Sequence, residues 1–483
     1  MNTSTSTTAS AGCPAGNEST QAIREALGNF DKRAIRNYRA KAGKPDLSHI
    51  PGGKGMPYFG HMYWFVSDVH RWLDKQYEQH GPVFKFNAPG VGDTVFLLGP
   101  EANQLVLQNE NKLFSNFLAW DTVFATLFDN NLLERDFANH KAHRRILQSA
   151  FKRHAIEGHI DIMNPLLKNG IDSWQSGSPI KAMDHLKQLL LETGSAVFLG
   201  AKSSDESKPL NKAFSDIVAA TTDPLRRKEI WFSPYAKGVR ANGVLSDYIA
   251  AQLPSRRANE GRDLFSQFCH LRDADGGLFT DEEIRDHVIF LLFAAHDTTT
   301  SALSAILFAL ASNLSWQEEL RQEMLDLDKA NIEFDDITAL TKTGWTLKEA
   351  LRMYPALSVM PRYALEEFEY AGHKIPANTT VTVSALFSHY MPEFWSNPHT
   401  FDPARFSPER TEEKGHQFQY IPFGGGAHKC LGMHFAEVQT KMFLFHLLKH
   451  YRVEKQGWQK RYRFNPIPLA FPTDGLPLTF ERL

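Results

Sequence analysis

The stretch FGGGAHKCLG, from Phe423 to Gly432, sets Cys430 among four glycines and two basic side chains. A lone cysteine is most often a small buried apolar residue, but these neighbours favour another role. Residues 431–450 follow with the apolar periodicity of a helix, so Cys430 is predicted at or just before a helix N-terminus. The helix dipole and the N–H groups of a glycine-rich turn would lower the pKa of the thiol. The stretch therefore predicts a soft, anionic metal ligand.

Other motifs fail to explain these glycines and cysteines. A dinucleotide-binding turn is excluded because Lys429 stands where the third glycine of G-x-G-x-x-G should be, and neither a P-loop nor a GxSxG sequence is present. Cys13, Cys269 and Cys430 share no CxxC spacing, which argues against a disulfide framework and against a structural zinc site. A reducing, cytoplasmic compartment fits this cysteine usage best.

The composition is that of a soluble globular protein. The chain has 483 residues, of which 42% are hydrophobic and 12% aromatic, and its formal net charge is -2. These values exclude a disordered tail and a strongly basic nucleic-acid-binding protein. No basic segment followed by an apolar one opens the chain, and no run of eighteen apolar residues occurs, so neither a secretion signal nor a transmembrane span is predicted.

The domain organisation is predicted from composition and periodicity. Residues 1–20 are rich in serine and threonine and predict a disordered leader, and residues 21–45 predict an amphipathic helix with several basic side chains. Such a helix either docks on the protein or rests weakly on a membrane. Residues 46–483 show no linker between two blocks of different composition, so one large domain is predicted.

The predicted fold is mainly α with small β-sheets. Strands are predicted near 83–88 and 94–98, joined by a Gly/Pro turn, and a second strand pair is predicted from FEY (368–370) and VTV (381–383). Helical periodicity dominates from about 100 to 355, and the tail from Tyr462 to Leu483 is predicted to be extended.

One long helix is predicted from 280 to 313, where Thr280 and Glu283 form a capping box and most residues are apolar. About 30 residues would span on the order of 45 Å, so this helix could cross a whole domain within the core. His296, Asp297 and three threonines interrupt it. The threonines could simply bond to carbonyls one turn back. A buried Asp297 must be paired, protonated or close to a wet cavity, and beside Thr298 it could relay protons to a bound ligand.

These stretches together resemble the cytochrome P-450 superfamily. FGGGAHKCLG resembles its haem-thiolate loop, through Phe423, Gly426, Cys430 and Gly432. FAAHDTTT resembles the oxygen-binding groove of the family's central helix, KEALR its Glu-x-x-Arg pair, and PARF its later arginine. The resemblance implies a cytochrome P-450 fold that extends over nearly the whole chain.

The resemblance also implies a haem b (iron protoporphyrin IX) held by the Cys430 thiolate. The remaining residues that it implies around the haem are His140, Arg144, Arg362 and His428 for the propionates, and a buried cluster of Glu349, Arg352 and Arg405 behind the loop. His428 departs from the arginine that is more common at its position. On residue chemistry alone, Glu349 and Arg352 could equally be a solvated helix-surface pair.

The implied activity is that of a monooxygenase, which inserts one oxygen atom from O2 into a lipophilic substrate. Asp297 and Thr298 would steer protons during this reaction. No flavin-binding or iron–sulfur-binding segment is recognisable, so electrons are expected from a ferredoxin or flavodoxin and its NAD(P)H-dependent reductase. Part of the basic face around Lys141 and Arg145 could dock such an acidic partner.

The substrate pocket is predicted from the regions that line it in the family. The candidate lining residues are Phe117, Trp120, Phe124, Phe293, Val359, Met360 and Ile467. Each aromatic residue among them could equally belong to the core. The cysteine loop is similar to that of sterol 14-demethylases, which usually have His-Thr in place of Asp297-Thr298. A steroid or sterol, a terpenoid and a fatty acyl substrate all remain candidates.

Three other functions are open at this point. A peroxide-driven hydroxylase of the same fold usually has Arg-Pro in place of the acid–alcohol pair, and a hydroperoxide isomerase should lack the alcohol. Asp297 and Thr298 therefore count against both. A haem-based sensor or lipid-binding protein would need no proton relay.

Overall fold

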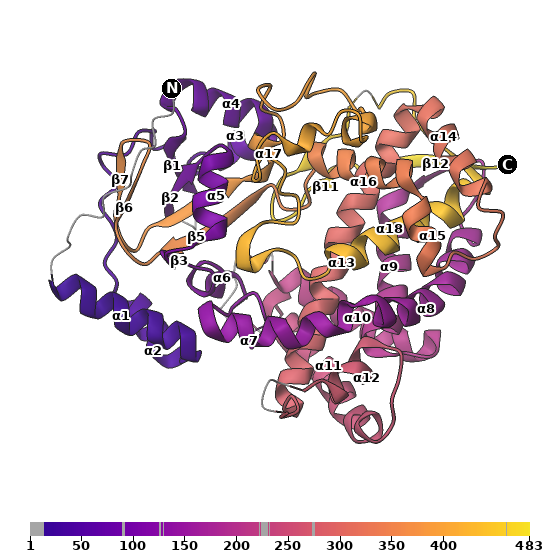
Figure 1. Cartoon of the computed structure of the whole chain (residues 1–483), viewed down its shortest axis with the longest axis horizontal. Helices are drawn as coiled ribbons and strands as arrows, with labels where there is room; N and C mark the ends of the chain where they lie inside the picture. The colour runs from indigo at the N-terminus through magenta and orange to yellow at the C-terminus, as the bar shows by residue number, and fades with distance from the viewer. Residues whose placement is uncertain are drawn as a thin grey trace.

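The computed structural model describes residues 14–88, 92–124, 127–128, 130–221, 223, 230, 232–272, 276–459 and 461–483. The fold is mainly helical with small sheets, as predicted. Figure 1 shows the strands of residues 83–88, 92–97 and 359–375 gathered on one side of the molecule, with the helices of residues 153–172, 182–199 and 314–339 on the other.

The helices before the long central one are α1 Pro14–Asn29, α2 Lys32–Lys41, α3 Met62–Ser67, α4 Val69–His80, α5 Pro100–Gln108, α6 Phe117–Phe124, α7 Phe137–Leu147, α8 Arg153–Asp172, α9 Ala182–Leu199, α10 Ser204–Thr221, α11 Pro234–Ala258 and α12 Leu264–His270. The central helix and those after it are α13 Asp281–Ser312, α14 Leu314–Leu325, α15 Phe334–Ala339, α16 Thr341–Met353, α17 Ala385–Ser388 and α18 Met433–Leu448. Short 3-10 turns are η1 Gln148–Phe151, η2 Pro403–Phe406, η3 Glu412–Lys414 and η4 Gly426–His428.

The strands are β1 Val83–Ala88, β2 Gly92–Leu97, β3 Phe114–Ser115, β4 Pro179–Lys181, β5 Val359–Ala364, β6 Phe368–Tyr370, β7 His373–Ile375, β8 Thr380–Ser384, β9 Tyr451–Lys455, β10 Phe464–Asn465, β11 Phe471–Pro472 and β12 Pro477–Arg482. The largest sheet has the order β1-β2-β8-β5-β3, and a second has the order β4-β12-β9. In the large sheet β1 and β2 pair antiparallel, with Val83 opposite Leu97, which confirms the first predicted strand pair.

The second predicted strand pair was wrong. FEY forms β6, but it pairs with β7 and not with the VTV strand β8. Ala371 and Gly372 both have positive φ, at 48° and 78°, so two residues suffice to reverse the chain after Tyr370. The VTV strand is thereby free to lie between β2 and β5 in the centre of the large sheet.

Helix α13 begins and ends where the sequence predicted. The capping box is present, since Thr280 accepts a hydrogen bond from Glu283 N while the Glu283 carboxylate accepts from Thr280 N. Within the described ranges it is the one helix long and apolar enough to cross a membrane, but 78% of its most apolar window is buried inside the protein. It is therefore the core helix of this fold.

The N-terminal region differs from its prediction. Residues 1–13 lie outside the described part of the chain, but α1 begins at Pro14, inside the segment predicted as a leader. Two helices replace the single one predicted for 21–45, because Phe30 has a positive φ of 58° and Asp31 caps α2 by accepting from Ala34 N. That 46–483 form a single domain stays a prediction.

Candidate active site

A glycine allows the loop that carries Cys430 to pack closely against helix α5. Gly426 has a φ of +63°, and a Cβ added there would lie 1.9 Å from the carbonyl oxygen of Leu107 at the end of α5. Only glycine permits both this backbone conformation and this approach. Cys430 N donates to the Phe423 carbonyl at 2.9 Å, and α18 begins three residues after the cysteine, with Gly432 as its N-cap.

The surroundings of the Cys430 thiol only partly match the sequence prediction. Burial by surrounding protein is the largest influence and raises the pKa of the thiol, whereas a hydrogen bond from Gly432 N–H and the positive charges of Arg144 and Lys429 act to lower it. Burial therefore outweighs the groups that the sequence predicted would lower the pKa of this thiol. Cys430 nevertheless has an exposed surface. Cys430 therefore keeps an accessible surface although protein surrounds its thiol.

Two arginines near this loop have N–H groups that donate to none of the described residues. Arg362 on β5 is buried, and among the described residues its guanidinium makes a single hydrogen bond, from Nη1 to the Pro361 carbonyl at 2.8 Å. Burial lowers the pKa of Arg362 to about 10. Arg144 on α7 makes no hydrogen bond or ion pair to any described residue, and burial lowers its pKa as well. Desolvated guanidinium groups with unused N–H donors favour an added anion.

Two histidines complete this basic group. The rings of His140 on α7 and His428 in the cysteine loop lie with their centroids 3.9 Å apart. Burial lowers the pKa of His140 to about 2, and it also lowers the pKa of His428. Nε2 of His428 lies 3.6 Å from a carboxylate oxygen of Asp136.

Asp136 is a residue that the sequence analysis missed. Its carboxylate accepts from Ser115 Oγ at 2.6 Å and from the backbone N–H groups of Asn116 and Phe117 at 2.9 and 3.1 Å. It therefore ties the start of α6 to α7 and faces His428. A sequence signal was available, because an aspartate directly before the apolar start of a helix is typical of an N-cap.

Four residues in the middle of α13 keep some accessible surface. Between Asp286 and Ala311 every residue is buried except Phe293, Ala294, Ala295 and Thr298. Thr298 Oγ1 donates to the Ala294 carbonyl at 2.6 Å, and Thr300 Oγ1 donates to the His296 carbonyl at 2.9 Å. Both threonines thus bond one turn back, as one of the two sequence interpretations had it, while Thr298 keeps an accessible surface.

Asp297 is buried and has a partner. Its Oδ1 lies 3.0 Å from Nδ1 of the neighbouring His296, and no other hydrogen bond to its carboxyl group is formed by the described residues. Nε2 of His296 lies 2.9 Å from the Lys187 carbonyl on α9. The two helices α9 and α13 are therefore joined at the level of Asp297.

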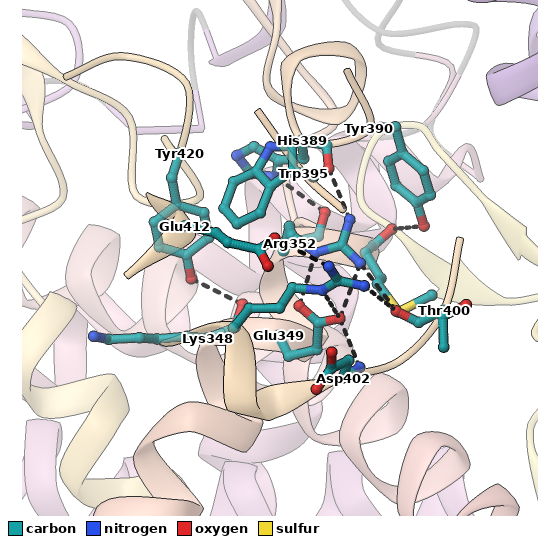
Figure 2. Close-up of polar contacts among 12 residues, drawn as sticks. Lys348, Glu349, Arg352, His389, Tyr390, Trp395, Thr400, Asp402, Glu412 and Tyr420 are labelled. Carbon is teal, nitrogen blue, oxygen red and sulfur yellow. Dashed lines mark hydrogen bonds and ion pairs between the residues drawn. The ribbon is translucent and has the colours of Figure 1, made fainter. Parts of the chain in front are cut away.

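The cluster behind the cysteine loop is fully buried. Figure 2 shows its polar contacts around Glu349 and Arg352. Glu349 accepts from Arg352 Nε at 2.7 Å and Nη2 at 2.9 Å, and from Arg405 Nε at 3.2 Å. Burial alone would lower the pKa of Arg352, but the Glu349 carboxylate outweighs it and the pKa is raised. Asp402 N also donates to Glu349, at 2.9 Å, so this carboxylate connects α16 to η2.

His389 was also missed by the sequence analysis. Its Nδ1 lies 3.0 Å from the Arg352 carbonyl, and its Nε2 accepts from Ile421 N at 2.9 Å. Because a carbonyl oxygen only accepts and a backbone N–H only donates, Nδ1 carries the ring proton. His389 therefore links the buried cluster to the chain just before Phe423. The residue follows no short motif, so only the fold reveals it.

The seven predicted pocket residues fall into separate groups. Trp120 and Phe124 on α6 are stacked at 5.5 Å, and Phe124 meets Phe293 of α13 edge-on at 5.8 Å. Val359 and Ile467 pack against a second apolar cluster, and Met360 belongs to a third. Phe117 is buried in a fourth cluster with residues of α1 and α2, and Trp120 also packs against this cluster.

A separate cavity of about 190 Å³ lies between α11 and α13, and none of the predicted pocket residues lines it. Phe128 lines it and also contacts Phe293, with ring centroids 4.6 Å apart. Through Phe128 the cavity thus adjoins the aromatic group of α6 and α13.

The donor set fits a haem. A haem offers an iron that accepts a thiolate and two propionates that need cations or N–H donors. Cys430 supplies an accessible sulfur, and Arg144 and Arg362 supply unused N–H groups at the same end of the site. Phe423 and Leu431 of the cysteine loop pack against the same apolar cluster as Phe293, Ala294 and Ala295 of α13.

Comparisons with known proteins agree with this arrangement. A family model described as "Cytochrome P450" matches residues 50–480. The chain is 32% identical over 442 residues to "Putative cytochrome P450 136" of Mycobacterium tuberculosis, covering 90% of this chain and 89% of the relative. It is 28% identical to "Taxoid 7-beta-hydroxylase" of Taxus cuspidata, covering 90% and 89%. The solved structure of "Retinoic acid bound cyanobacterial CYP120A1" superposes with a TM-score of 0.80 at 23% identity, covering 90% of this chain and 99% of that one.

Proposed function

The chain belongs to the cytochrome P450 family and is a haem-dependent monooxygenase, and from this premise we propose which of its residues hold the haem, move protons and select the substrate. Cys430 is the thiolate ligand of a haem b. Binding to the metal offsets the desolvation that raises the pKa of the free thiol, because the cation stabilises the anionic sulfur.

Four residues are proposed to receive the haem propionates. Arg362 and Arg144 donate to one carboxylate each or share them, and His140 and His428 add N–H donors. The support is that both guanidinium groups are desolvated and have unused N–H groups. Phe423, Gly426 and Gly432 shape the loop around the sulfur. Glu349, Arg352 and Arg405 brace this loop from behind.

Once bound, the haem supplies the oxygen chemistry, which inserts one atom of O2 into a C–H or double bond. Asp297 and Thr298 are proposed to move protons toward it. Thr298 has the only hydroxyl on the accessible turn of α13. Asp297, the residue directly before it, supplies the carboxyl group. Phe293, Ala294 and Ala295 keep that turn apolar, which limits the entry of water.

The substrate is proposed to be lipophilic and, among the candidate classes, a terpenoid. The stacked rings of Trp120 and Phe124 and the ring of Phe293 offer a rigid apolar wall, which suits a ring system better than a flexible acyl chain. A relative that is 28% identical is named for hydroxylating a taxoid, a terpenoid. Electrons are proposed to come from a ferredoxin or flavodoxin with its NAD(P)H-dependent reductase, in the cytoplasm.

The observation that carries this proposal is an accessible Cys430 whose loop neighbours Phe423 and Leu431 pack against the same apolar cluster as the accessible turn of α13. The test is the absorption spectrum of the ferrous CO complex. The wild type should show the thiolate-type band, and Cys430→Ala should lose it while Cys269→Ala, which replaces the other described cysteine, should keep it. A thiolate-type band in Cys430→Ala would refute the ligand assignment.

Turnover separates the proposed class from its rivals. Substrate-dependent NAD(P)H consumption with product formation is expected when a ferredoxin or flavodoxin chain is supplied. Equal product formation from hydrogen peroxide alone would favour the peroxide-driven hydroxylase, and the absence of any substrate-dependent consumption would favour a sensor or lipid-binding role. A panel of terpenoids, sterols and fatty acids that is scored by displacement of the sixth iron ligand tests the substrate class.

A further inference from the structure

His296 stands directly before the proposed acid, and the proposed relay makes no use of it. Its ring is buried between two helices and makes two polar contacts, one through each nitrogen. Nε2 faces the Lys187 carbonyl on α9 at 2.9 Å, and Nδ1 faces Asp297 Oδ1 at 3.0 Å. Both partner atoms are oxygens that accept hydrogen bonds, and this sets how many protons the group must hold.

A neutral imidazole next to an ionised carboxylate cannot satisfy both contacts. With the proton on Nε2, the lone pair of Nδ1 faces a carboxylate oxygen; with the proton on Nδ1, the lone pair of Nε2 faces a carbonyl oxygen. Either arrangement leaves two acceptors opposed inside the protein, where an unmade hydrogen bond is costly. One more proton removes the conflict, either as imidazolium with carboxylate or as imidazole with carboxylic acid.

Among the described residues, no other charged group neutralises the opposed acceptors of His296 and Asp297. Lys187 contributes its carbonyl, while its ammonium group lies over the ring of Phe471 at 4.6 Å. The ring of Phe214 on α10 meets the His296 ring edge-on at 5.3 Å. Gln439 of α18 lines a small cavity of about 10 Å³ beside His296, and it carries no charge. Within the described ranges, Asp297 has no lysine or arginine as an ion-pair partner.

We propose that His296 and Asp297 form one proton-holding pair, in which His296 is a positioning residue and the proton between Nδ1 and Oδ1 is the one that the relay delivers. This inference rests on the proposed role of Asp297 and Thr298. The Lys187 carbonyl fixes the Nε2–H tautomer, so the ring cannot satisfy Asp297 without the additional proton.

The proton balance of the step is simple. The pair gives one proton to the Thr298 side of α13 and is left as a neutral imidazole and a carboxylate. Nothing is oxidised or reduced in the pair. Because this state opposes two acceptors, the pair takes a proton back from solvent, and the relay is refilled for the next delivery.

Infrared spectroscopy reads the proton content of the pair without turnover. Light-induced difference spectra of the ferrous CO holoenzyme should contain either a carboxylic-acid C=O band that shifts in D2O and is lost in Asp297→Asn, or imidazolium ring modes that shift with ¹⁵N-histidine and are lost in His296→Asn. His446→Asn, which removes another buried histidine, should leave the bands unchanged. A carboxylate band from Asp297 with neither of the other signatures would overturn the proposal.

Turnover then separates storage of the proton from mere orientation of Asp297. His296→Asn keeps an N–H donor at the position of Nδ1, so it can orient the Asp297 carboxylate but cannot hold the additional proton. We expect product formed per NAD(P)H to fall about tenfold with KM nearly unchanged, since proton transfer by a placed group is worth 10²–10⁴-fold at most. Wild-type coupling in His296→Asn would overturn the proposal. A wild type without any substrate-dependent turnover would instead refute the proposed function, and the infrared result would stand apart from it.

Discussion

Gly426 is the residue on which the geometry of the cysteine loop depends most directly. Its positive φ and the 1.9 Å approach of the Leu107 carbonyl to a would-be Cβ exclude any other side chain. We predict that Gly426→Ala lowers the thermal midpoint by several degrees and strongly reduces the haem content of the purified protein, because the backbone conformation alone costs about 1–2 kcal/mol. Haem content and thermal unfolding measure this.

Gly457 is the control. It lies outside the cysteine loop, and nothing lies within 4 Å of an added Cβ. Gly457→Ala should keep both the haem and the thermal midpoint. A Gly426→Ala protein that binds haem like the wild type would show that α5 and the loop can move apart.

Glu349 is the only carboxylate in direct contact with both buried arginines of its cluster, as far as the described residues go. We predict that Glu349→Gln, which keeps the shape but removes the charge, destabilises the fold by about 3–5 kcal/mol, because two buried guanidinium groups lose their shared partner. Denaturant unfolding of the holoenzyme measures the change.

An exposed pair of the same spacing provides the comparison. Glu318 and Arg321 on α14 are also three residues apart and bond at 2.9 Å, but they lie on the surface. Glu318→Gln should change the stability far less, since exposed pairs contribute little. Equal effects of the two substitutions would mean that Glu349 is not a stabilising centre.

At the level of elements, local patterns were predicted well and partner choice was not. The bounds of α13 follow from its capping box and its apolar run, which involve neighbouring residues only. β6 and β8 were recognised as strands, but which strand each one pairs with depends on the turn at Ala371 and Gly372 and on where β2 lies. Spatial partners from distant segments, such as Asp136 and His389, leave no periodic trace in the sequence.

The N-terminal helices show the same limit. The burial of Phe117 follows from packing against α1 and α2, which precede the region matched by the family model. Arg36 of α2 also bonds to Asp121 of α6, at 3.2 Å. The two helices therefore hold α6, the element that carries Trp120 and Phe124, from the outside.

This contact predicts a local effect of Ile35, which is fully buried in the same apolar cluster. Ile35→Ala should lower the free energy needed to open this cluster by about 2–5 kcal/mol. Amide hydrogen exchange in residues 117–124 should therefore become faster. Exchange in α13 should stay as in the wild type. Exchange mass spectrometry measures both segments.

Asn37 lies on the exposed side of α2 and serves as the control. Asn37→Ala should leave exchange in α6 unchanged. If Ile35→Ala left it unchanged as well, α1 and α2 would be bystanders to the position of α6.

On the scale of the whole molecule, buried neutral histidines tie stability to pH. Burial lowers the pKa of His389 to about 3 and those of His159 and His446 to about 4. All three side chains are buried in separate parts of the fold. In the unfolded chain a histidine takes up a proton near pH 6.5, so below that pH the unfolded state binds protons that the folded state does not.

The free energy of unfolding should therefore fall as the pH is lowered from 6.5 toward 4, by about 1.4 kcal/mol per pH unit for each such histidine, and should not gain from them above pH 7.5. Thermal midpoints between pH 7.5 and 5 measure this slope. His446→Gln keeps a donor for the Asn164 side chain, which now receives a bond from Nε2 at 3.0 Å, but it cannot titrate, so it should make the slope shallower. His154→Gln should leave the slope unchanged, because that ring is in water in both states. A slope that is the same in all three proteins would mean that His446 is protonated in the folded state, and the burial of its ring would then have to be relieved by water.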